Sequence, residues 1–301
     1  MSPDNSIDTG TKPELLSMSR EELKSFMTEA FGEKAFRGDQ VYDWIHKKRV
    51  TDPALMSNIP RKLRDELISS CKGASAVQLE KKVSALDGTR KYLIGMEDGN
   101  VVESVLMQYS YGDSACISSQ AGCAMGCSFC ASAIGGFVRN LTASEMLEEI
   151  YLIEKDSGRR IHSTVVMGTG EPLMNYDELL KFIRILSDPE GDCLSQRNIT
   201  VSTCGIVPAI YSLAEEELQI NLAVSLHAPN DAVRRKIMPV SRRYSIDEVL
   251  KACRYYFEKT GRRLTFEYSL IEGVNDSEEN AGELARILSG MNCLINLIPV
   301  N

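Results

Sequence analysis

The chain has 301 residues, of which 43% are hydrophobic and 25% charged, as in a globular protein with one large core and room for a small second domain. No apolar run reaches the roughly 18 residues that a membrane-spanning helix needs, and the polar first 12 residues contain no signal-peptide core. Nine cysteines without such a signal indicate a reducing, cytoplasmic setting, in which thiols serve metals or catalysis.

The net charge of −8 argues against a general nucleic-acid binder, because neutralising phosphates takes clustered Lys and Arg. Four short basic clusters could still contact a nucleic acid locally, although a solvated face is the more common role of any one of them. They are Lys47-Lys48-Arg49, Arg61-Lys62 with Arg64, Arg234-Arg235-Lys236 and Arg242-Arg243.

The first part of the chain predicts a disordered leader and a small helical domain. Residues 1–13 are rich in Ser, Asp, Asn and Gly, a composition typical of disorder. Ser19 and Glu22 form the pattern of a capping box, followed by apolar residues at helical spacing. Further helices are expected around 41–45 and from about 60 to 69. Residues 14–72 therefore predict a three-helix accessory domain.

Residues 73–111 predict a β-meander that links this domain to the rest of the chain. From residue 76 on, apolar and polar residues alternate in period two, with turn signals at Asp87-Gly88 and Asp98-Gly99. Glu103 falls in the last of these strands. A lone Glu on a strand usually faces solvent, so the pattern by itself assigns it no role.

The remainder, residues 112–301, alternates apolar strands with amphipathic helices. Strands are expected near 114–119, 163–168, 198–204, 220–227, 262–271 and 293–300, and helices near 142–156, 176–187, 206–217, 245–259 and 276–289. This order predicts an α/β fold of parallel strands with crossover helices. Six units are too few for a closed eight-stranded barrel.

A C-x₃-C-x₂-C run at Cys123, Cys127 and Cys130 is the strongest functional signal. Three thiolates on one loop can bind three irons of a cubane cluster and leave the fourth iron open, and an open position is typical of catalytic metal sites. Zinc sites also use cysteines, but they usually pair two C-x₂-C units or add histidines. No second unit is present, and the three histidines are scattered at positions 46, 162 and 227.

The C-x₃-C-x₂-C run is the signature of radical S-adenosylmethionine (SAM) enzymes. The surrounding segments resemble the adenine carbon-2 methyltransferases of 23S rRNA and tRNA, the RlmN family, and the similarity extends from about Leu15 to the last residue. The segments are Cys116-Ile-Ser-Ser-Gln-Ala-Gly-Cys123, Gly135-Gly-Phe-Val-Arg-Asn-Leu141 and Met167-Gly-Thr-Gly-Glu-Pro-Leu-Met-Asn175.

This resemblance implies a fold, two cofactors and several partners. The fold is the partial (β/α)₆ barrel of radical SAM enzymes with an N-terminal RNA-binding domain. The cofactors are one 4Fe-4S cluster and SAM. The substrates are 23S rRNA and tRNA, and the electron donor is a protein such as flavodoxin or ferredoxin. We expect a monomer with no membrane partner.

The resemblance also implies the residues of the site. Cys123, Cys127 and Cys130 would hold the cluster, whose open iron is chelated by the amino and carboxylate groups of SAM. The SAM contacts would come from Gly170, Glu171, Ser202, Ser225, Leu226, His227 and the terminal Asn301. Period two places Ser202 with Cys204, and Ser225 with His227, on shared strand faces. These polar residues could instead simply bond one another inside the barrel.

Two catalytic roles are implied in the same way. Cys116 would be the thiol that resolves a protein–RNA adduct, and Glu103 a proton acceptor. From the residues alone, a buried inert cysteine is the default for Cys116. The remaining cysteines have no paired spacing and are expected to be packing residues; they are Cys71, Cys193, Cys204, Cys253 and Cys293.

One element of the family scheme has no match in the sequence. The family transfers a methyl group from SAM to a protein cysteine in a C-terminal Ala-Cys-Gly context, and radical chemistry with a second SAM then joins that carbon to adenine. No segment resembles this context, and Cys293 is in the wrong place to substitute. We interpret the chain as a truncated form, although a protein that binds SAM and cluster without completing methyl transfer is the alternative.

Two other functions stay open at this point. A sister class methylates carbon 8 of the same rRNA adenine and gives antibiotic resistance, but it often has Gly-Glu-Ala where this chain has Gly-Glu-Pro at 170–172. A non-catalytic RNA-binding paralogue is the third possibility.

Overall fold

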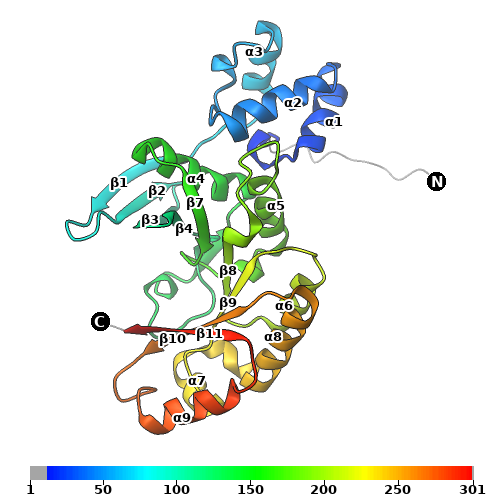
Figure 1. The fold of residues 1–301 in the computed structure, drawn as a ribbon. Coiled ribbons are helices and arrows are strands. Elements are labelled where there is room, and N and C mark those ends of the chain that lie inside the picture. The colour runs from blue at the N-terminus through cyan, green and yellow to red at the C-terminus, as the bar shows by residue number, and fades with distance from the viewer. Residues whose placement is uncertain (1–11, 300–301) are drawn as a thin grey trace. The chain divides into compact units, whose positions relative to one another are not determined.

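The computed structural model describes residues 12–299. These residues divide into two compact units: the first runs to Ser75 and includes Arg184–Cys193, and the second comprises Ala76–Ile183 and the chain from Leu194 on (Figure 1). Most of the predicted leader, residues 1–11, and the predicted SAM ligand Asn301 lie outside the described residues.

The first unit is helical, as the sequence predicts. Its helices are α1 (Arg20–Phe31), α2 (Phe36–Tyr42), a π-helical turn at Asp43–Lys47 and α3 (Arg61–Ser70). The capping box is confirmed, because the Ser19 hydroxyl accepts from the Glu22 amide at 3.3 Å and the Ser19 amide donates to the Glu22 carboxylate at 2.6 Å. The later segment Arg184–Cys193 joins this unit through a hydrogen bond from the Tyr42 hydroxyl to Asp188 at 2.9 Å.

The second unit is built on one mixed sheet in the order β1-β2-β3-β4-β7-β8-β9-β10-β11. Neighbours from β1 to β4 pair antiparallel, and neighbours from β4 to β11 pair parallel. The strands are β1 (Val77–Val83), β2 (Arg90–Gly95), β3 (Val101–Tyr109), β4 (Gly112–Ile117), β7 (Ile161–Val166), β8 (Ile199–Thr203), β9 (Asn221–Ser225), β10 (Leu264–Leu270) and β11 (Cys293–Pro299). The predicted α/β barrel strands are confirmed, and the predicted meander is continuous with them.

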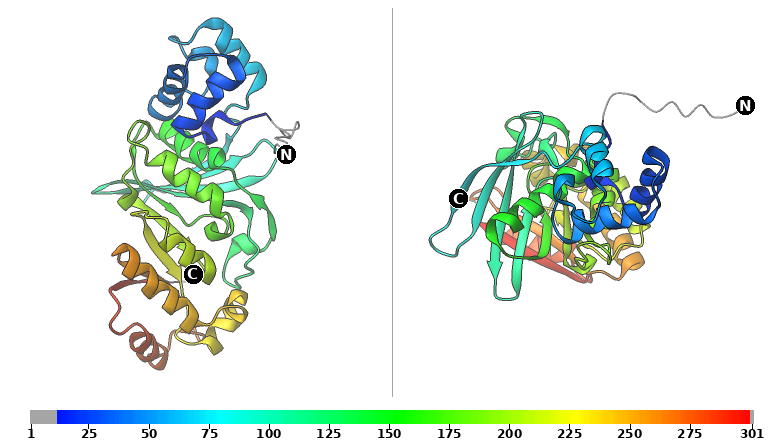
Figure 2. Two further views of the ribbon diagram at one scale, coloured as in Figure 1. Left: turned by 90° about the vertical axis from the view of Figure 1, so that its right-hand side faces the viewer. Right: turned by 90° about the horizontal axis from the view of Figure 1, so that it is seen from above.

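Helices follow the parallel strands in the predicted alternation. They are α4 (Ala143–Ser157), α5 (Tyr176–Leu186), α6 (Val207–Ala214), α8 (Ile246–Thr260) and α9 (Glu278–Ile287). In the left view of Figure 2, α5, α6 and α8 lie in front of the strands, on one face of the sheet. A short helix that the sequence analysis did not predict, α7 (Asp231–Ile237), follows β9.

The register of the sheet shows which side chains share its other face. Cys116 pairs with Val105 on β3 and with Val165 on β7. Val105 pairs in turn with Lys91, and Val165 with Thr200. Because directly paired residues point to the same side of a sheet, the meander and the barrel strands present one continuous face.

Candidate active site

One hollow of about 150 Å³ opens at the carboxyl ends of β7, β8 and β9, where ligands bind in folds of parallel strands. Its lining brings together most of the residues that the sequence analysis singled out, namely Cys123, Cys127, Cys130, Gly170, Glu171, Ser202, Ser225 and His227. At this end of β8 and β9 the lining contains Ser202, Cys204, Ser225 and His227, which the predicted alternation puts on shared faces, and also Thr203. Leu226 is not part of the lining, and its side chain is buried in the core.

The loop that carries the three cysteines is fixed by backbone contacts. The Cys123 amide donates to Gly136 O at 2.9 Å, and the Ser128 amide donates to Ile237 O, at the end of α7, at 2.9 Å. Gly122 has φ +74°, and a Cβ atom there would lie 1.9 Å from Gly136 O. Only glycine fits this close approach, so the backbone before the first cysteine is held against the strand β6 (Phe137–Asn140) and its preceding turn.

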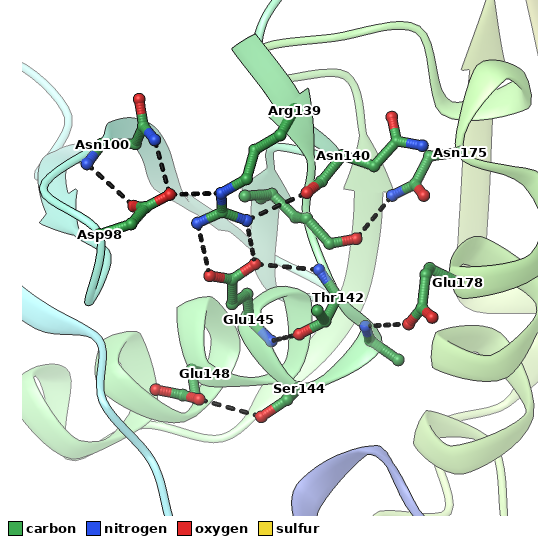
Figure 3. A network of polar contacts seen from close by, with 12 residues as sticks. Asp98, Asn100, Arg139, Asn140, Thr142, Ser144, Glu145, Glu148, Asn175 and Glu178 are labelled. Carbon is green, nitrogen blue, oxygen red and sulfur yellow. Dashed lines mark hydrogen bonds and ion pairs between the residues drawn. The ribbon is translucent and has the colours of Figure 1, made fainter. Parts of the chain in front are cut away.

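The β6 strand is anchored in turn by a polar network (Figure 3). Arg139 binds Asp98 at 2.5 Å and both oxygens of Glu145, at the start of α4, at 2.7 and 2.8 Å. The Asn175 amide group donates to Leu141 O at 2.8 Å. A bidentate Arg–carboxylate pair is geometrically specific, so the network fixes the loop after β6 relative to the helix that follows it.

Two of the three motif thiols, those of Cys123 and Cys127, are protonated in the metal-free protein. Burial, followed by the neighbouring Cys130 and Cys123, raises the pKa of Cys127 to about 12, and burial also raises the pKa of Cys123. Within residues 12–299, no three Cys, His, Asp or Glu side chains converge on a point where a single metal ion could sit. A cubane makes a different demand, because each thiolate binds its own iron. The donor set, three thiols around one hollow, fits that demand.

Glu171 is a buried carboxylate at the rim of β7. One of its oxygens accepts from the Leu173 amide at 3.1 Å and the other from the Cys204 amide at 2.6 Å. Burial raises its pKa above that of a free glutamate. The preceding Gly170 has φ +113°, and a Cβ atom there would lie 2.6 Å from the Gln120 Cβ. The turn therefore requires glycine and presents a carboxylate that can accept further hydrogen bonds from a cationic ligand.

His227 supplies a donor of defined tautomer. Its Nδ1 accepts from the Ser269 amide at 2.9 Å, so the proton of the neutral ring is on Nε2. Burial, with the positive charge of Arg234 as a second cause, lowers the pKa of His227 to about 4, which keeps the ring neutral at physiological pH. The ring meets Phe129 of the cysteine loop edge to face at 4.8 Å.

Comparisons with known proteins agree with this geometry. Residues 117–285 match the radical SAM superfamily, and residues 13–72 match the N-terminal domain of ribosomal RNA large subunit methyltransferases. The chain is 54% identical over 290 residues to a probable dual-specificity RNA methyltransferase RlmN of Lachnoclostridium phytofermentans, covering 96% of this chain and 81% of the relative. A relative of the same description from Clostridium perfringens strain 13 is 50% identical, with coverages of 95% and 82%.

A solved structure is similar over the same extent. The crystal structure of a radical SAM methyltransferase from Sphaerobacter thermophilus matches with a TM-score of 0.91 and 43% identity, covering 96% of this chain and 85% of that one. The chain belongs to the RlmN family of radical SAM RNA methyltransferases. Its cofactors are accordingly a 4Fe-4S cluster and SAM, and the predicted enzyme class and fold are confirmed. No helix within residues 12–299 has the length and apolarity to cross a bilayer.

Cys116 lies on β4 beside the RlmN-family hollow. It pairs in register with Val165 on β7, two residues before Met167, which lines the hollow. Burial, with the nearby Glu149 as a second cause, raises the pKa of Cys116 to about 11, so the thiol is neutral in the resting protein. The structure thus places this cysteine next to the predicted cluster and SAM residues.

Glu103 lies elsewhere on the same sheet face. It forms an ion pair with Lys91 at 2.6 Å, and its side chain is 50% exposed. It lines a separate hollow of about 70 Å³ with Glu80, Lys82 and Leu93, and its side chain is not in the lining of the cysteine hollow. The structure thus places Glu103 on the same sheet face as Cys116, two residues from its partner Val105, but outside the cysteine hollow.

One predicted surface residue is in fact part of the site's framework. Arg234, assigned to a basic cluster that could contact a nucleic acid, is 0% exposed. Its guanidinium donates to Cys204 O at 2.7 Å, Leu226 O at 3.1 Å and Ser225 O at 3.2 Å. Arg234 is buried because it lies on α7. The sequence does not predict this helix, since it is only seven residues long and its Asn230 cap and buried Ile237 are weak signals. Its neighbours Arg235 and Lys236 are exposed.

Proposed function

We propose that the protein methylates carbon 2 of adenine in 23S rRNA and in tRNA. The observation that carries this proposal is the grouping of three motif thiols, Glu171 and His227 around one hollow, with a further thiol, Cys116, beside it. The names of the relatives, probable dual-specificity RNA methyltransferases at 50–54% identity, support two classes of RNA substrate.

In this proposal one group of residues in the hollow holds the cluster and another binds SAM. Cys123, Cys127 and Cys130 hold the cluster. Gly170 and Glu171 receive the amino group of SAM, whose ammonium pairs with the buried carboxylate. The other contacts come from Ser202, Ser225, the backbone around Leu226, and His227, together with Asn301. When bound, the cluster and SAM supply one-electron chemistry, which carbon 2 requires because it is an electrophilic position.

The remaining steps involve two proposed catalytic residues on one sheet face. Cys116 resolves the adduct in which the methyl carbon bridges the family's carrier cysteine and adenine. Its thiol loses a proton and forms a disulfide with the carrier sulfur, while the carbon–sulfur bond breaks and the carbon keeps the electron pair and takes up a proton. Glu103 is the proposed proton acceptor. It is two residues from Val105, the direct partner of Cys116, so both side chains face the same side of the sheet. The exposed carboxylate of Glu103 is accessible to an RNA substrate that covers this face.

We also propose a compartment, an electron donor and an oligomeric state for the enzyme. Ribosomal and transfer RNA place it in the cytoplasm, and a one-electron donor such as flavodoxin or ferredoxin reduces the cluster. The N-terminal helical unit serves RNA binding, and the enzyme acts as a monomer.

Mass spectrometry of adenines in rRNA and tRNA from a deletion strain tests the substrate assignment. We expect 2-methyladenine to disappear from both RNAs, to return with the native gene, and to stay absent with the Cys127→Ala gene as the matched control. Loss of 8-methyladenine instead would identify the sister class, and unchanged adenines in both RNAs would contradict the proposal.

The role of Cys116 has its own test. In the native enzyme, Cys116→Ala should leave cluster content and SAM binding intact but block release of the RNA. A nuclease-sensitive protein–RNA band above the free protein should then accumulate on a denaturing gel. Cys204→Ala, which removes another buried thiol, should show no such band. Normal product without trapped RNA would make Cys116 a packing residue.

A further inference from the structure

Arg234 is a buried cation with no carboxylate partner. Its three hydrogen-bond acceptors are carbonyl oxygens, which are uncharged, and its Nη1 is buried without any partner. Within residues 12–299, no acid forms an ion pair with it. The nearest acid along the chain, Asp231, instead accepts from the Ile246 amide at 2.9 Å. Buried charges in proteins are normally paired, so this arrangement needs an anion that the side chains do not provide.

The guanidinium lies directly behind the wall of the cysteine hollow. The Cys204 carbonyl that accepts from Arg234 belongs to a residue whose side chain lines the hollow. That side chain packs in one apolar cluster with Met238 and Ile237, against which Cys127 also packs. The positive charge of Arg234 can act on a bound 4Fe-4S cluster through these apolar side chains, because a medium of low dielectric constant weakens electrostatic interactions only slightly.

We propose that Arg234 is the fixed counter-charge of the 4Fe-4S cluster, a positioning residue that holds the ends of β8 and β9 and stabilises the reduced cluster. Three thiolates give the bound cubane a net negative charge, and reduction by one electron makes it more negative. A buried cation nearby favours both states and favours the reduced one more. The inference rests on the family's cofactor and is independent of which RNA or which adenine carbon is methylated.

Reductive titration of the reconstituted holoenzyme, followed by electron paramagnetic resonance without RNA or SAM, tests this proposal. Arg234→Gln removes the charge, and Arg235→Gln is the matched control at an exposed neighbour. At a fixed potential, we expect Arg234→Gln to lower the ratio of reduced to oxidised cluster about tenfold, which for one electron is a shift of about 59 mV to more negative potential. An unchanged potential in Arg234→Gln would overturn the proposal.

Arg234→Lys gives a second, independent readout, because a buried lysine can lose its charge within the accessible pH range. At low pH the reduction potential of this variant should equal that of the wild type. As the lysine deprotonates, the potential should shift by about 59 mV to more negative values, which lowers the ratio of reduced to oxidised cluster about tenfold. The titratable groups that face this position are Cys127, Cys204, His227, Asp231 and Cys253. The wild type contains all of them and serves as the control.

Absence of a pH step beyond that of the wild type would overturn the proposal even if Arg234→Gln does not fold. Failure of both variants to fold would assign Arg234 to the scaffold alone and would overturn it as well. Failure of the wild type to take up a cluster would contradict the cofactor assignment instead, so the two outcomes are distinguishable.

Discussion

Two hollows on the same face of one sheet hold charged side chains in opposite ways. In the cysteine hollow, the carboxylate of Glu171 is buried and is bound by two backbone amides. In the meander hollow, the carboxylate of Glu103 is half exposed and pairs with the flexible cation of Lys91. The first carboxylate is held by the fold, whereas the second is held by a side chain that water can replace.

The difference shows that the fold fixes the carboxylate of the cysteine hollow more rigidly than that of the meander hollow. Backbone donors cannot rotate away, and burial strengthens every interaction they make. An exposed ion pair is weak and exchanges readily with solvent. We therefore expect changes in the cysteine hollow to have large effects on cluster and SAM binding, and changes in the meander hollow to have small effects on SAM binding and stability.

The largest effect should come from the motif cysteines. Replacing Cys127 by Ala should remove most of the cluster absorbance and the iron, about four per chain in the wild type after anaerobic reconstitution. Cys204→Ala is the matched control, because Cys204 lines the same hollow outside the motif. Full iron content in Cys127→Ala would mean that the cluster binds elsewhere.

A large effect of pH should come from Glu149, a fully buried carboxyl on α4. Burial raises its pKa to about 8, so the native state keeps a proton that the unfolded state loses above pH 4.5. Stability must therefore fall as pH rises from 4.5 to 8, by about 5 kcal/mol at most. Glu149→Gln should remove this loss, as urea unfolding of the metal-free protein at several pH values would measure.

The comparison with the wild type isolates Glu149 from His227, whose lowered pKa has the opposite consequence. Stability from His227 is lost as pH falls from 6.5 to about 4, and both proteins share that loss. Equal slopes for Glu149→Gln and the wild type would show that Glu149 is ionised in the native protein.

The next largest effect should be on SAM affinity, and it should come from Glu171 but not from Glu103. Glu171→Gln keeps the shape of the side chain but removes the charge that we propose pairs with the ammonium of SAM, at a cost of about 3 kcal/mol, or roughly 100-fold in affinity. Glu103→Gln should bind SAM as the wild type does. Calorimetric titration of the cluster-loaded proteins with SAM measures both, and equal affinities in all three would remove Glu171 from the SAM site.

The smallest effect should come from the exposed pair itself. Lys91→Met breaks the contact with Glu103, in which both side chains are about half exposed. The free energy of unfolding should change by less than about 1 kcal/mol, since exposed ion pairs contribute little. A loss above about 2 kcal/mol would mean that the meander hollow is as rigid as the cysteine hollow.

The sequence by itself determined the elements and the cluster loop. Cysteine spacing, the capping box at Ser19 and the period of apolar residues all act within a few residues of one another. For this reason six parallel strands and the cysteine loop could be predicted close to where the structure has them. The family resemblance added the roles of residues that no local pattern identifies.

Only the tertiary structure decided which charges lose contact with water. Arg234 and Arg235 are neighbours of the same type in one basic cluster, but α7 turns the first into the core and the second to solvent. Likewise, the meander pairs with β4 in a single sheet, and residues 184–193 pack in the N-terminal unit. Burial depends on segments that are far apart along the chain, so local patterns cannot encode it, and burial in turn gives Glu171, His227 and Arg234 their chemistry.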